Sequence, residues 1–352
     1  MAKSHVWANW SEIDYDIYPY RKSWRAVAGT FEFPVDRFKV SNLLEIPCVN
    51  IVKKPIYNLS NISQNFEERY YATLDAVAAN VYNKAGDTKK IHLLYSGGVD
   101  SVAMFAALQR NSKYSEFVER NRFVVSLTSS SIDEYPFLFY TVILPTLPIV
   151  PLDYVALMSD PNILLVTGDM GDYMIGSSDV VSITNHDKSY DIMSSWNTIF
   201  DYVENYDGHE KYIDLAIQAK RKQPFEIESA NQFVWWLSQC FCYQDELVRP
   251  YIWSTETDLS TMVGDDKVFR FFYDDLFTSF SYEYMSTNPQ YKTFDDTRTW
   301  PKRYIVNHFG DSSYMDKPKI YSQRLTFRTV NATQIYYENG KLYSKNTGIK
   351  IE

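Results

Sequence analysis

The chain reads Ile91-His92-Leu93-Leu94-Tyr95-Ser96-Gly97-Gly98-Val99-Asp100-Ser101 where an apolar run gives way to two adjacent glycines. The run 91–95 predicts a buried parallel strand, and later apolar residues at helical spacing predict an amphipathic helix: Val102, Ala103, Phe105, Ala106 and Leu108. Glycines at such a junction let the backbone approach a ligand and present N–H groups at the helix N-terminus. Ser96 and Ser101 can add hydroxyl donors, while Asp100 repels bare phosphate unless a divalent cation bridges the two. The junction therefore predicts a magnesium pyrophosphate site.

The alternative is a plain strand-to-helix turn in which the glycines relieve strain and Asp100 caps the helix. The hexapeptide 96–101 is neither a Walker loop, which needs Gly-Lys-Ser/Thr, nor a Gly-x-Gly-x-x-Gly fingerprint. It resembles the PP-loop of ATP pyrophosphatases, enzymes that cleave ATP to AMP and pyrophosphate while adenylating a substrate. That resemblance leaves asparagine synthetases, tRNA thiolases, argininosuccinate synthetases and deazaguanine synthases open.

A second motif follows the apolar run 163–166 and reads Thr167-Gly168-Asp169-Met170-Gly171-Asp172-Tyr173-Met174-Ile175-Gly176. It resembles the Ser-Gly-Glu-Gly-x-Asp-Glu-x-x-Gly-Gly segment of the asparagine synthetase and β-lactam synthetase family. This chain departs from that segment at two positions. Asp169 is one methylene shorter than the family's Glu, and Tyr173 replaces an acid. Two carboxylates at this spacing can face one cleft, one holding a cation and one handling a proton or an amine. A solvated Gly/Asp loop after a strand is the alternative interpretation.

A third, shorter match lies near the C-terminal end of the resemblance. Lys302-Arg303-Tyr304-Ile305-Val306 and Met315-Asp316-Lys317-Pro318-Lys319 resemble a late Lys-x-x-Leu-Arg helix and Arg-x-Lys loop of the same family. On this match Lys319 stands at a lysine that contacts phosphates, with Lys317 at the Arg. Surface lysines beside a proline turn are the alternative.

The resemblance implies a set of site residues. Asp100 and Asp172 would hold Mg²⁺, Asp169 would bind or deprotonate an amine, and Lys319 would stabilise charge during adenylation. Leu127 and Thr128, at the end of the predicted strand 123–127, are candidates for adenine contact. The predicted ATP contacts are Leu94, Ser96, Gly97, Gly98, Val99, Asp100, Ser101, Leu127, Thr167 and Gly168.

Alternating apolar runs and helical patterns predict an α/β fold with a parallel sheet, and the resemblance implies a HUP-like (adenine nucleotide α-hydrolase-like) sheet with helices on both faces. Predicted strands are 91–95, 123–127, 147–150 and 163–166, and a leading helix ends at Gly86-Asp87. A mainly helical region follows, with apolar stripes at Ala230, Phe233, Val234, Leu237 and Phe241, and at Val268, Phe271, Phe272 and Leu276. We divide the chain into a β-rich segment 1–64, a PP-loop domain 65–190, a helical part 191–325 and a tail 326–352 with a hairpin at Asn339-Gly340.

Composition limits the function classes. The chain of 352 residues has 44 acidic and 35 basic residues, and its net charge of −9 argues against an extended nucleic-acid footprint. Three cysteines, Cys48, Cys240 and Cys242, form neither a disulfide framework nor a four-cysteine zinc site, which weakens the deazaguanine synthase and thiolase alternatives. The uncharged stretch 135–152 is broken by prolines and predicts a buried helix, a turn and a strand rather than a membrane span. No signal-peptide pattern opens the chain, so we expect a cytoplasmic enzyme.

The leading functional hypothesis is an ATP-dependent amide-forming ligase that activates a carboxylate and passes it to ammonia or an amine. Ala2 stands where the family's glutaminase would expose a cysteine, so glutamine is not the expected nitrogen source. One alternative keeps the site and adenylates a nucleobase carbonyl in a nucleotide or nucleic acid. Another is a non-catalytic ATP- or AMP-binding module, and a homodimer stays open.

Overall fold

A computed structural model describes residues 4–7, 65–127, 129–176, 190–203, 209–242, 257–258, 266–290, 294–318, 333–338 and 341–346. Within them, five strands form a parallel sheet in the order β4-β3-β2-β5-β7. The strands are β2 (Lys90–Leu94), β3 (Phe123–Leu127), β4 (Ile149–Pro151), β5 (Ile163–Thr167) and β7 (Val268–Arg270). Counted along the chain, this order is 3-2-1-4-5, which is consistent with a Rossmann-like or HUP-like α/β fold.

The register brings the carboxyl ends of the strands to one edge. One row of paired residues crosses the sheet at Ile149, Val125, Leu93, Val166 and Phe269. The central strands β3 and β5 are buried along their whole length, because helices cover a parallel sheet on both faces. Loops that leave the strands at this edge therefore lie close together.

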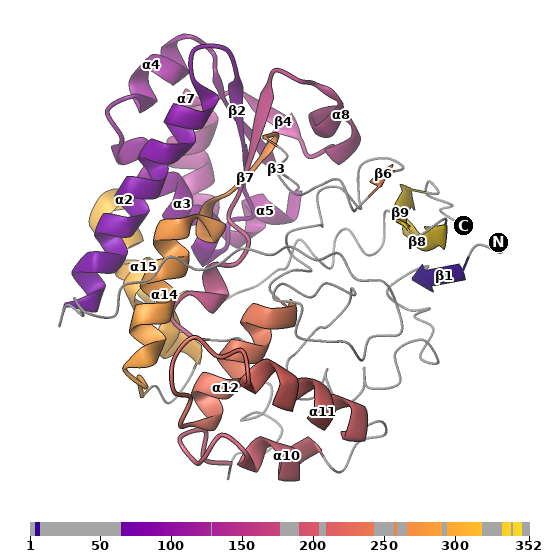
Figure 1. Cartoon of the computed structure of the whole chain (residues 1–352). Coiled ribbons are helices and arrows are strands. Elements are labelled where there is room, and N and C mark those ends of the chain that lie inside the picture. Colours follow the sequence, from indigo (N-terminus) through magenta and orange to yellow (C-terminus); the bar gives the residue numbers. More distant parts are fainter. Residues whose placement is uncertain are drawn as a thin grey trace.

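Helices pack on both sides of the strands. Figure 1 shows α2, α3, α14 and α15 together on one side, with α8 on the other. The first group comprises α2 (Phe66–Ala85), α3 (Val99–Arg110), α14 (Asp275–Ser286) and α15 (Phe294–Phe309). The shorter elements between β2 and the second motif, 167–176, which we call the acid motif, are α4 (Tyr114–Glu119), α5 (Ser129–Glu134), α6 (Pro136–Leu138), η2 (Phe139–Ile143), α7 (Leu144–Thr146) and α8 (Tyr154–Ser159). The one-turn helix η3 (Gly171–Tyr173) lies within this motif.

A helical region follows the acid motif, as predicted. It contains α10 (Thr198–Val203), α11 (His209–Lys220), and α12 (Ala230–Leu237), which continues into the π-helical turn η4 (Ser238–Cys242). Ser229 and Gln232 form a capping box at the start of α12. Every residue of α12 is buried, so the part of the predicted apolar stripe from Ala230 to Leu237 is one side of a helix enclosed on all sides, while the side chain of Phe241 lies outside the described residues.

The predicted helical stripe through Val268 and Leu276 is wrong. Val268–Arg270 pairs with β5 as the edge strand β7, and a 3-10 turn, η6 (Phe271–Tyr273), separates it from α14. Asp274 caps α14 by accepting the Leu276 N–H at 2.9 Å, and Leu276 is exposed. A short apolar run fits a strand and a helix equally well, and here pairing with β5 decides between them.

The uncharged stretch 135–152 forms α6, η2, α7 and β4, which agrees with the predicted helix, turn and strand. The helical part is not wholly buried, because Phe137, Tyr140 and Leu144 are exposed. In the part of the chain that the structure describes, no helix has both the length and the apolar character needed to cross a bilayer.

Strands β8 (Thr333–Glu338) and β9 (Lys341–Asn346) pair antiparallel on either side of the predicted Asn339-Gly340 turn. Together with β1 (Ser4–Trp7) and β6 (Thr257–Asp258) they make up the second sheet found among the described residues. Most of segment 1–64, the adenine candidate Thr128, the thiol side chain of Cys242 and the catalytic candidate Lys319 lie outside the described residues.

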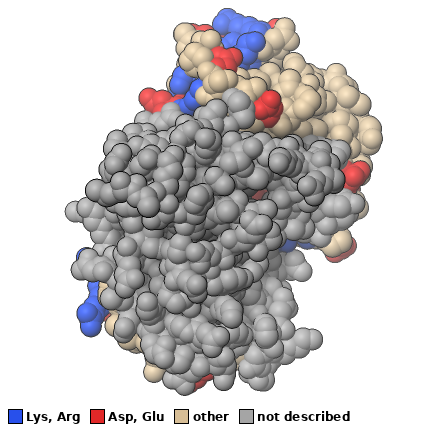
Figure 2. Space-filling view, turned by 90° about the vertical axis from the view of Figure 1, so that its right-hand side faces the viewer, with Lys and Arg blue, Asp and Glu red and all other residues tan. Residues whose placement is uncertain are grey.

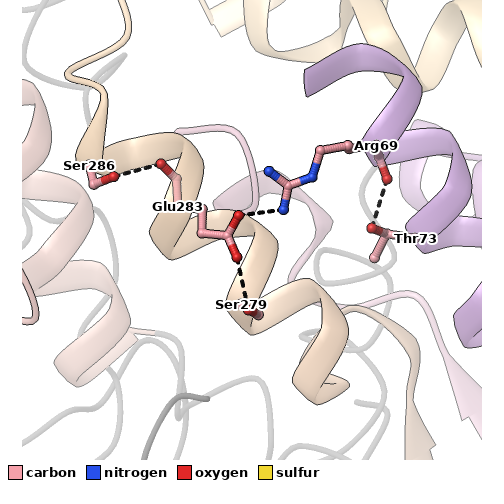
Figure 3. A network of polar contacts seen from close by, with 5 residues as sticks. All are labelled: Arg69, Thr73, Ser279, Glu283 and Ser286. Carbon is pink, nitrogen blue, oxygen red and sulfur yellow. Dashed lines mark hydrogen bonds and ion pairs between the residues drawn. The ribbon is translucent and has the colours of Figure 1, made fainter. Parts of the chain in front are cut away.

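A polar network joins helix α2 to helix α14 (Figure 3). The Arg69 guanidinium on α2 donates to a Glu283 carboxylate oxygen on α14, and the Glu283 side chain is 9% exposed. Ser279 donates to the other carboxylate oxygen at 3.3 Å, so both oxygens of this buried acid have partners. The pair fixes α2 against α14.

Charged surface residues of both signs are interspersed. In Figure 2, lysines and arginines of the described residues lie near acids along the upper part of the visible face. Exposed ion pairs such as Lys84–Asp266 at 3.2 Å and Arg120–Glu116 at 3.1 Å follow the same pattern. Pairs of this kind add little to stability, because water screens them.

Acid is expected to destabilise the fold through His92, a buried residue of the central strand β2. Burial, and then the nearby Lys90 charge, lower the pKa of His92 to about 4, while Asp160 acts in the opposite direction. The unfolded chain binds this proton near the ordinary pKa of about 6.5. The contribution of neutral His92 to the free energy of unfolding is therefore complete above pH 6.5, and it is lost as the pH falls towards 4. Urea unfolding of the wild type and His92→Gln across this range should show the steeper decline in the wild type, and parallel curves would contradict this.

Candidate functional site

The two glycine-containing motifs meet at the carboxyl edge of the sheet, because β2 and β5 are neighbours. A methyl group added at Gly168 would lie 3.1 Å from the Cα of Ser101 and 3.1 Å from its backbone nitrogen. A methyl group at Gly171 would lie 2.8 Å from the Cβ of Asp100 and closer still to its carboxyl carbon. The acid loop after β5 thus packs directly on the start of α3, and the carboxyl group of Asp100 lies against the backbone of Gly171.

Gly97 adopts a left-handed conformation with φ +76°. A methyl group there would lie 2.6 Å from the carbonyl oxygen of Ser131 and 2.7 Å from the Cβ of Glu134. The loop therefore packs tightly under α5, and glycine is required at this position for both backbone and space. At Gly98 the surroundings differ, since the nearest described atom to an added methyl group is Ser96 Oγ at 3.4 Å. Gly98 thus offers a face to which another molecule has access.

Two serine hydroxyls close the loop. Ser101 Oγ donates to the Gly98 carbonyl at 3.0 Å and accepts the Ser96 N–H at 3.2 Å. The two hydroxyls are 2.8 Å apart, and Ser96 Oγ accepts the Gly98 N–H at 3.3 Å. These serines, which we predicted as ligand donors, thus shape the turn itself. Gly98 is the N-cap of α3, and none of the described side chains caps that first turn. Its N–H groups and the helix dipole favour an anion there.

The acid loop presents Asp169 and Asp172, both partly exposed. Met170 has the left-handed φ of +86°, and the one-turn helix η3 begins directly after it. Asp172 Oδ1 accepts from the Arg298 guanidinium of α15 at 3.3 Å. Tyr173, which replaces an acid in the motif that this loop resembles, is buried.

The carboxylates Asp100 and Asp172 influence the same buried phenol. Burial raises the pKa of Tyr70 on α2 well above its usual value, and both carboxylates raise it further, with Asp100 the stronger. The described residues include no group of three or more His, Cys, Asp or Glu that could hold a metal ion. Two carboxylates nevertheless suit Mg²⁺, which takes its remaining oxygens from substrate phosphates and water.

Thr167 Oγ1 and Lys317 Nζ are among the buried polar atoms that have no hydrogen-bond partner in the described part of the chain. Thr167 ends β5, directly before Gly168. Lys317 extends over the ring of Tyr135, with Nζ 5.7 Å from the ring centre. Burial lowers the pKa of Lys317, and Glu134 partly offsets this. Such atoms usually have a partner in water or in a ligand.

Lys302 holds the segment that carries Lys317. Its ammonium group donates to the Met315 carbonyl at 2.9 Å and to the Lys317 carbonyl at 3.1 Å. The preceding 3-10 turn, η7 (Ser312–Asp316), contacts the N-cap of α6 through Tyr314, whose ring centre lies 4.4 Å from that of the N-cap residue Tyr135. The predicted late match therefore combines a buried structural lysine, Lys302, with a partly buried lysine, Lys317, whose Nζ atom is buried.

The predicted nucleotide contacts fall at the same edge of the sheet. Leu94 and Leu127 are buried at the ends of β2 and β3, and Thr167 is buried at the end of β5. Sequence reasoning missed Tyr70, Glu134 and Arg298, which no local pattern distinguishes. Helix packing alone brings them to the two loops.

Comparison with known proteins identifies no relative of this chain. No protein-family model, curated protein or solved structure matches the chain.

Proposed function

We propose that this protein is an ATP-dependent ligase of the PP-loop type, resembling the asparagine synthetases. It binds ATP with Mg²⁺, activates a carboxylate as an acyl-adenylate and transfers the acyl group to ammonia or an amine. The observation that carries the proposal is the direct packing of the Gly168–Gly171 backbone on Asp100 and Ser101. This contact joins an anion-binding helix N-terminus to a loop with two further carboxylates.

The first element of support is a place for phosphates. The uncapped N-terminus of the 12-residue helix α3 and the accessible face of Gly98 suit a pyrophosphate group. Thr167 Oγ1 and Lys317 Nζ are unsatisfied among the described residues, and a bound anion would give each of them a partner. Lys317 is a second basic candidate beside the predicted Lys319.

The acids provide the second element. Asp100 and Asp172 would hold Mg²⁺, and its positive charge would offset the repulsion between phosphate oxygens and carboxylates. Asp172 contacts Arg298 at 3.3 Å, so this carboxylate is already oriented before a ligand binds.

The proposed reaction has two steps. A substrate carboxylate oxygen attacks the α-phosphorus of ATP, forming an acyl–phosphate bond as the bond to pyrophosphate breaks. The nitrogen of ammonia or an amine then attacks the acyl carbon, AMP leaves, and Asp169 accepts the proton that nitrogen loses. The basic side chains stabilise negative charge that develops on the departing pyrophosphate.

We expect the purified protein to bind ATP in the presence of Mg²⁺, measured by calorimetry. The variant Asp172→Asn should weaken Mg²⁺-dependent ATP binding by about tenfold or more, because it removes one carboxylate ligand. Asp266→Asn is the control, since Asp266 is an exposed acid paired with Lys84 away from the two loops. A folded wild type that binds no ATP with Mg²⁺ would overturn the proposal.

The acceptor is identified by pyrophosphate release. A panel of carboxylates, amines and nucleosides, with mass spectrometry of the products, separates the chemistries. Release that requires a carboxylate, followed by an amide product, supports the ligase. Release that requires a nucleoside would instead favour adenylation of a nucleobase carbonyl, and ATP binding without release favours a binding module.

A further inference from the structure

The backbone carbonyl of Tyr173 receives three side-chain donors from the described residues. Trp235 Nε1 donates at 3.1 Å, Gln239 Nε2 at 3.3 Å and Ser281 Oγ at 3.3 Å. All three side chains are buried, and they come from α12, from η4 and from α14. We call Trp235, Gln239 and Ser281 the Tyr173 anchor.

Three donors exceed what a carbonyl oxygen needs. Such an oxygen has two lone pairs, and one hydrogen bond is enough to satisfy it when it is buried. The carbonyl belongs to the residue directly after Asp172, at the end of the one-turn helix η3. Within that turn, the Tyr173 N–H donates to the Met170 carbonyl at 3.0 Å. The anchor therefore restrains the acid loop beyond what the short turn alone provides.

The two helices that supply Trp235 and Ser281 are themselves joined by hydrogen bonds. Gln232 Nε2 donates to the Met285 carbonyl at 2.8 Å, and Asn231 Nδ2 donates to the Pro289 carbonyl at 3.1 Å. These two bonds tie the start of α12 to the end of α14 and the residues that follow it. The donors on α12 and α14 are thus held in one unit, and the acid loop is attached to that unit through Tyr173.

We infer that Trp235, Gln239 and Ser281 are positioning residues that hold Asp172 where it and Asp100 can share one divalent cation. The inference rests on the proposed function. The anchor fixes the carbonyl of Tyr173, the residue that follows Asp172, while the packing of Gly171 on Asp100 restrains the residue that precedes it. With both neighbouring residues held, the Asp172 carboxylate has a narrow range of positions. Residues that orient metal ligands typically change metal affinity by 10–100-fold when removed.

The chain offers a matched pair of variants for the test. Trp235→Phe removes the indole N–H that holds Tyr173. Trp236→Phe, at the next residue, removes an equally buried indole N–H that donates to the Ala219 carbonyl at 2.7 Å. Both lose one hydrogen bond and similar packing, so both should lower the unfolding temperature by similar amounts. Only Trp235→Phe should raise the Mg²⁺ concentration needed for half-maximal ATP binding, by about tenfold.

A second pair avoids the change in ring size. Ser281→Ala removes an anchor hydroxyl, whereas Ser238→Ala removes a buried hydroxyl that donates to the Val234 carbonyl within α12. Ser281→Ala should also shift the Mg²⁺ requirement, and Ser238→Ala should leave it unchanged. If the anchor had a purely structural role, all four variants would lose stability, and none would change the Mg²⁺ concentration needed for half-maximal ATP binding.

Hydrogen exchange of the ligand-free protein gives a readout that is independent of the proposed function. Amides of residues 168–174 should exchange faster in Trp235→Phe and Ser281→Ala than in the wild type and the two controls. Faster exchange with an unchanged Mg²⁺ requirement would overturn the inference and leave the ligase proposal standing. Unchanged exchange would overturn it as well. Failure of the wild type to bind ATP would remove the proposed function and this inference together, whatever the exchange shows.

Discussion

We expect the Gly171→Ala variant to release pyrophosphate about 100-fold more slowly, because the added methyl group displaces the Asp100 carboxylate by roughly 1 Å. The added methyl group would lie 2.8 Å from the Asp100 Cβ and nearer to the carboxyl carbon. Gly171 is not among the glycines with positive φ, so its backbone accepts alanine and the effect falls on Asp100. The measurement is the steady-state rate of pyrophosphate release, with circular dichroism to confirm the fold.

A double variant assigns the effect to this contact. Gly171→Ala with Asp100→Ala removes the group with which the methyl collides. The double variant should regain the thermal stability that Gly171→Ala loses, yet stay inactive. Equal stability of the two variants would show that the methyl group meets some other part of the site. Wild-type activity of Gly171→Ala would argue against any role of Asp100 in the reaction.

The Arg69→Met variant is expected to reduce the free energy of unfolding by about 3 kcal/mol. It leaves the Glu283 carboxylate buried on α14 without its guanidinium partner, a costly state. Urea unfolding measures the loss. Arg110→Met is the matched control, because the Arg110–Asp75 pair is exposed on both sides and should cost at most about 1 kcal/mol.

A second change separates charge burial from lost packing. The double variant Arg69→Met and Glu283→Leu removes both charges and should recover a large part of the stability. If the double variant is as unstable as Arg69→Met alone, the loss comes from packing around the arginine stem rather than from an unpaired acid.

Local patterns were sufficient for the centre of the fold. The runs around Leu93, Val125 and Val166 are apolar and short, as strands buried on both faces must be, and each pairs in the sheet. The left-handed Gly97 turn was likewise visible as a glycine pair between a strand and a helix. In both cases the residues that determine the structure are neighbours in the chain.

The edge of the sheet and the contacts around the acid loop depend on residues far apart in the sequence. The edge strand β7 is three residues long, too short for a periodic signal, and its pairing with β5 decides its structure. Arg298 reaches Asp172 across 126 positions of the chain, and the Tyr173 anchor joins residues 62 and more positions apart. Single side chains of this kind carry no sequence pattern. The meeting of the Asp100 and Asp172 loops at one edge of the sheet was within reach of prediction, but the residues that contact these loops there were not.

The edge strand β7 also has a consequence for how the chain is made. β5 ends at Thr167, yet the strand that covers its open edge begins at Val268. During synthesis from the N-terminus, β5 therefore stays an unprotected edge while about a hundred further residues, with α10, α11 and α12 among them, leave the ribosome. An open edge of a hydrophobic parallel strand invites pairing with other chains. Completion of the sheet and attachment of the acid loop to α14 consequently fall late in synthesis, after residue 281 has emerged.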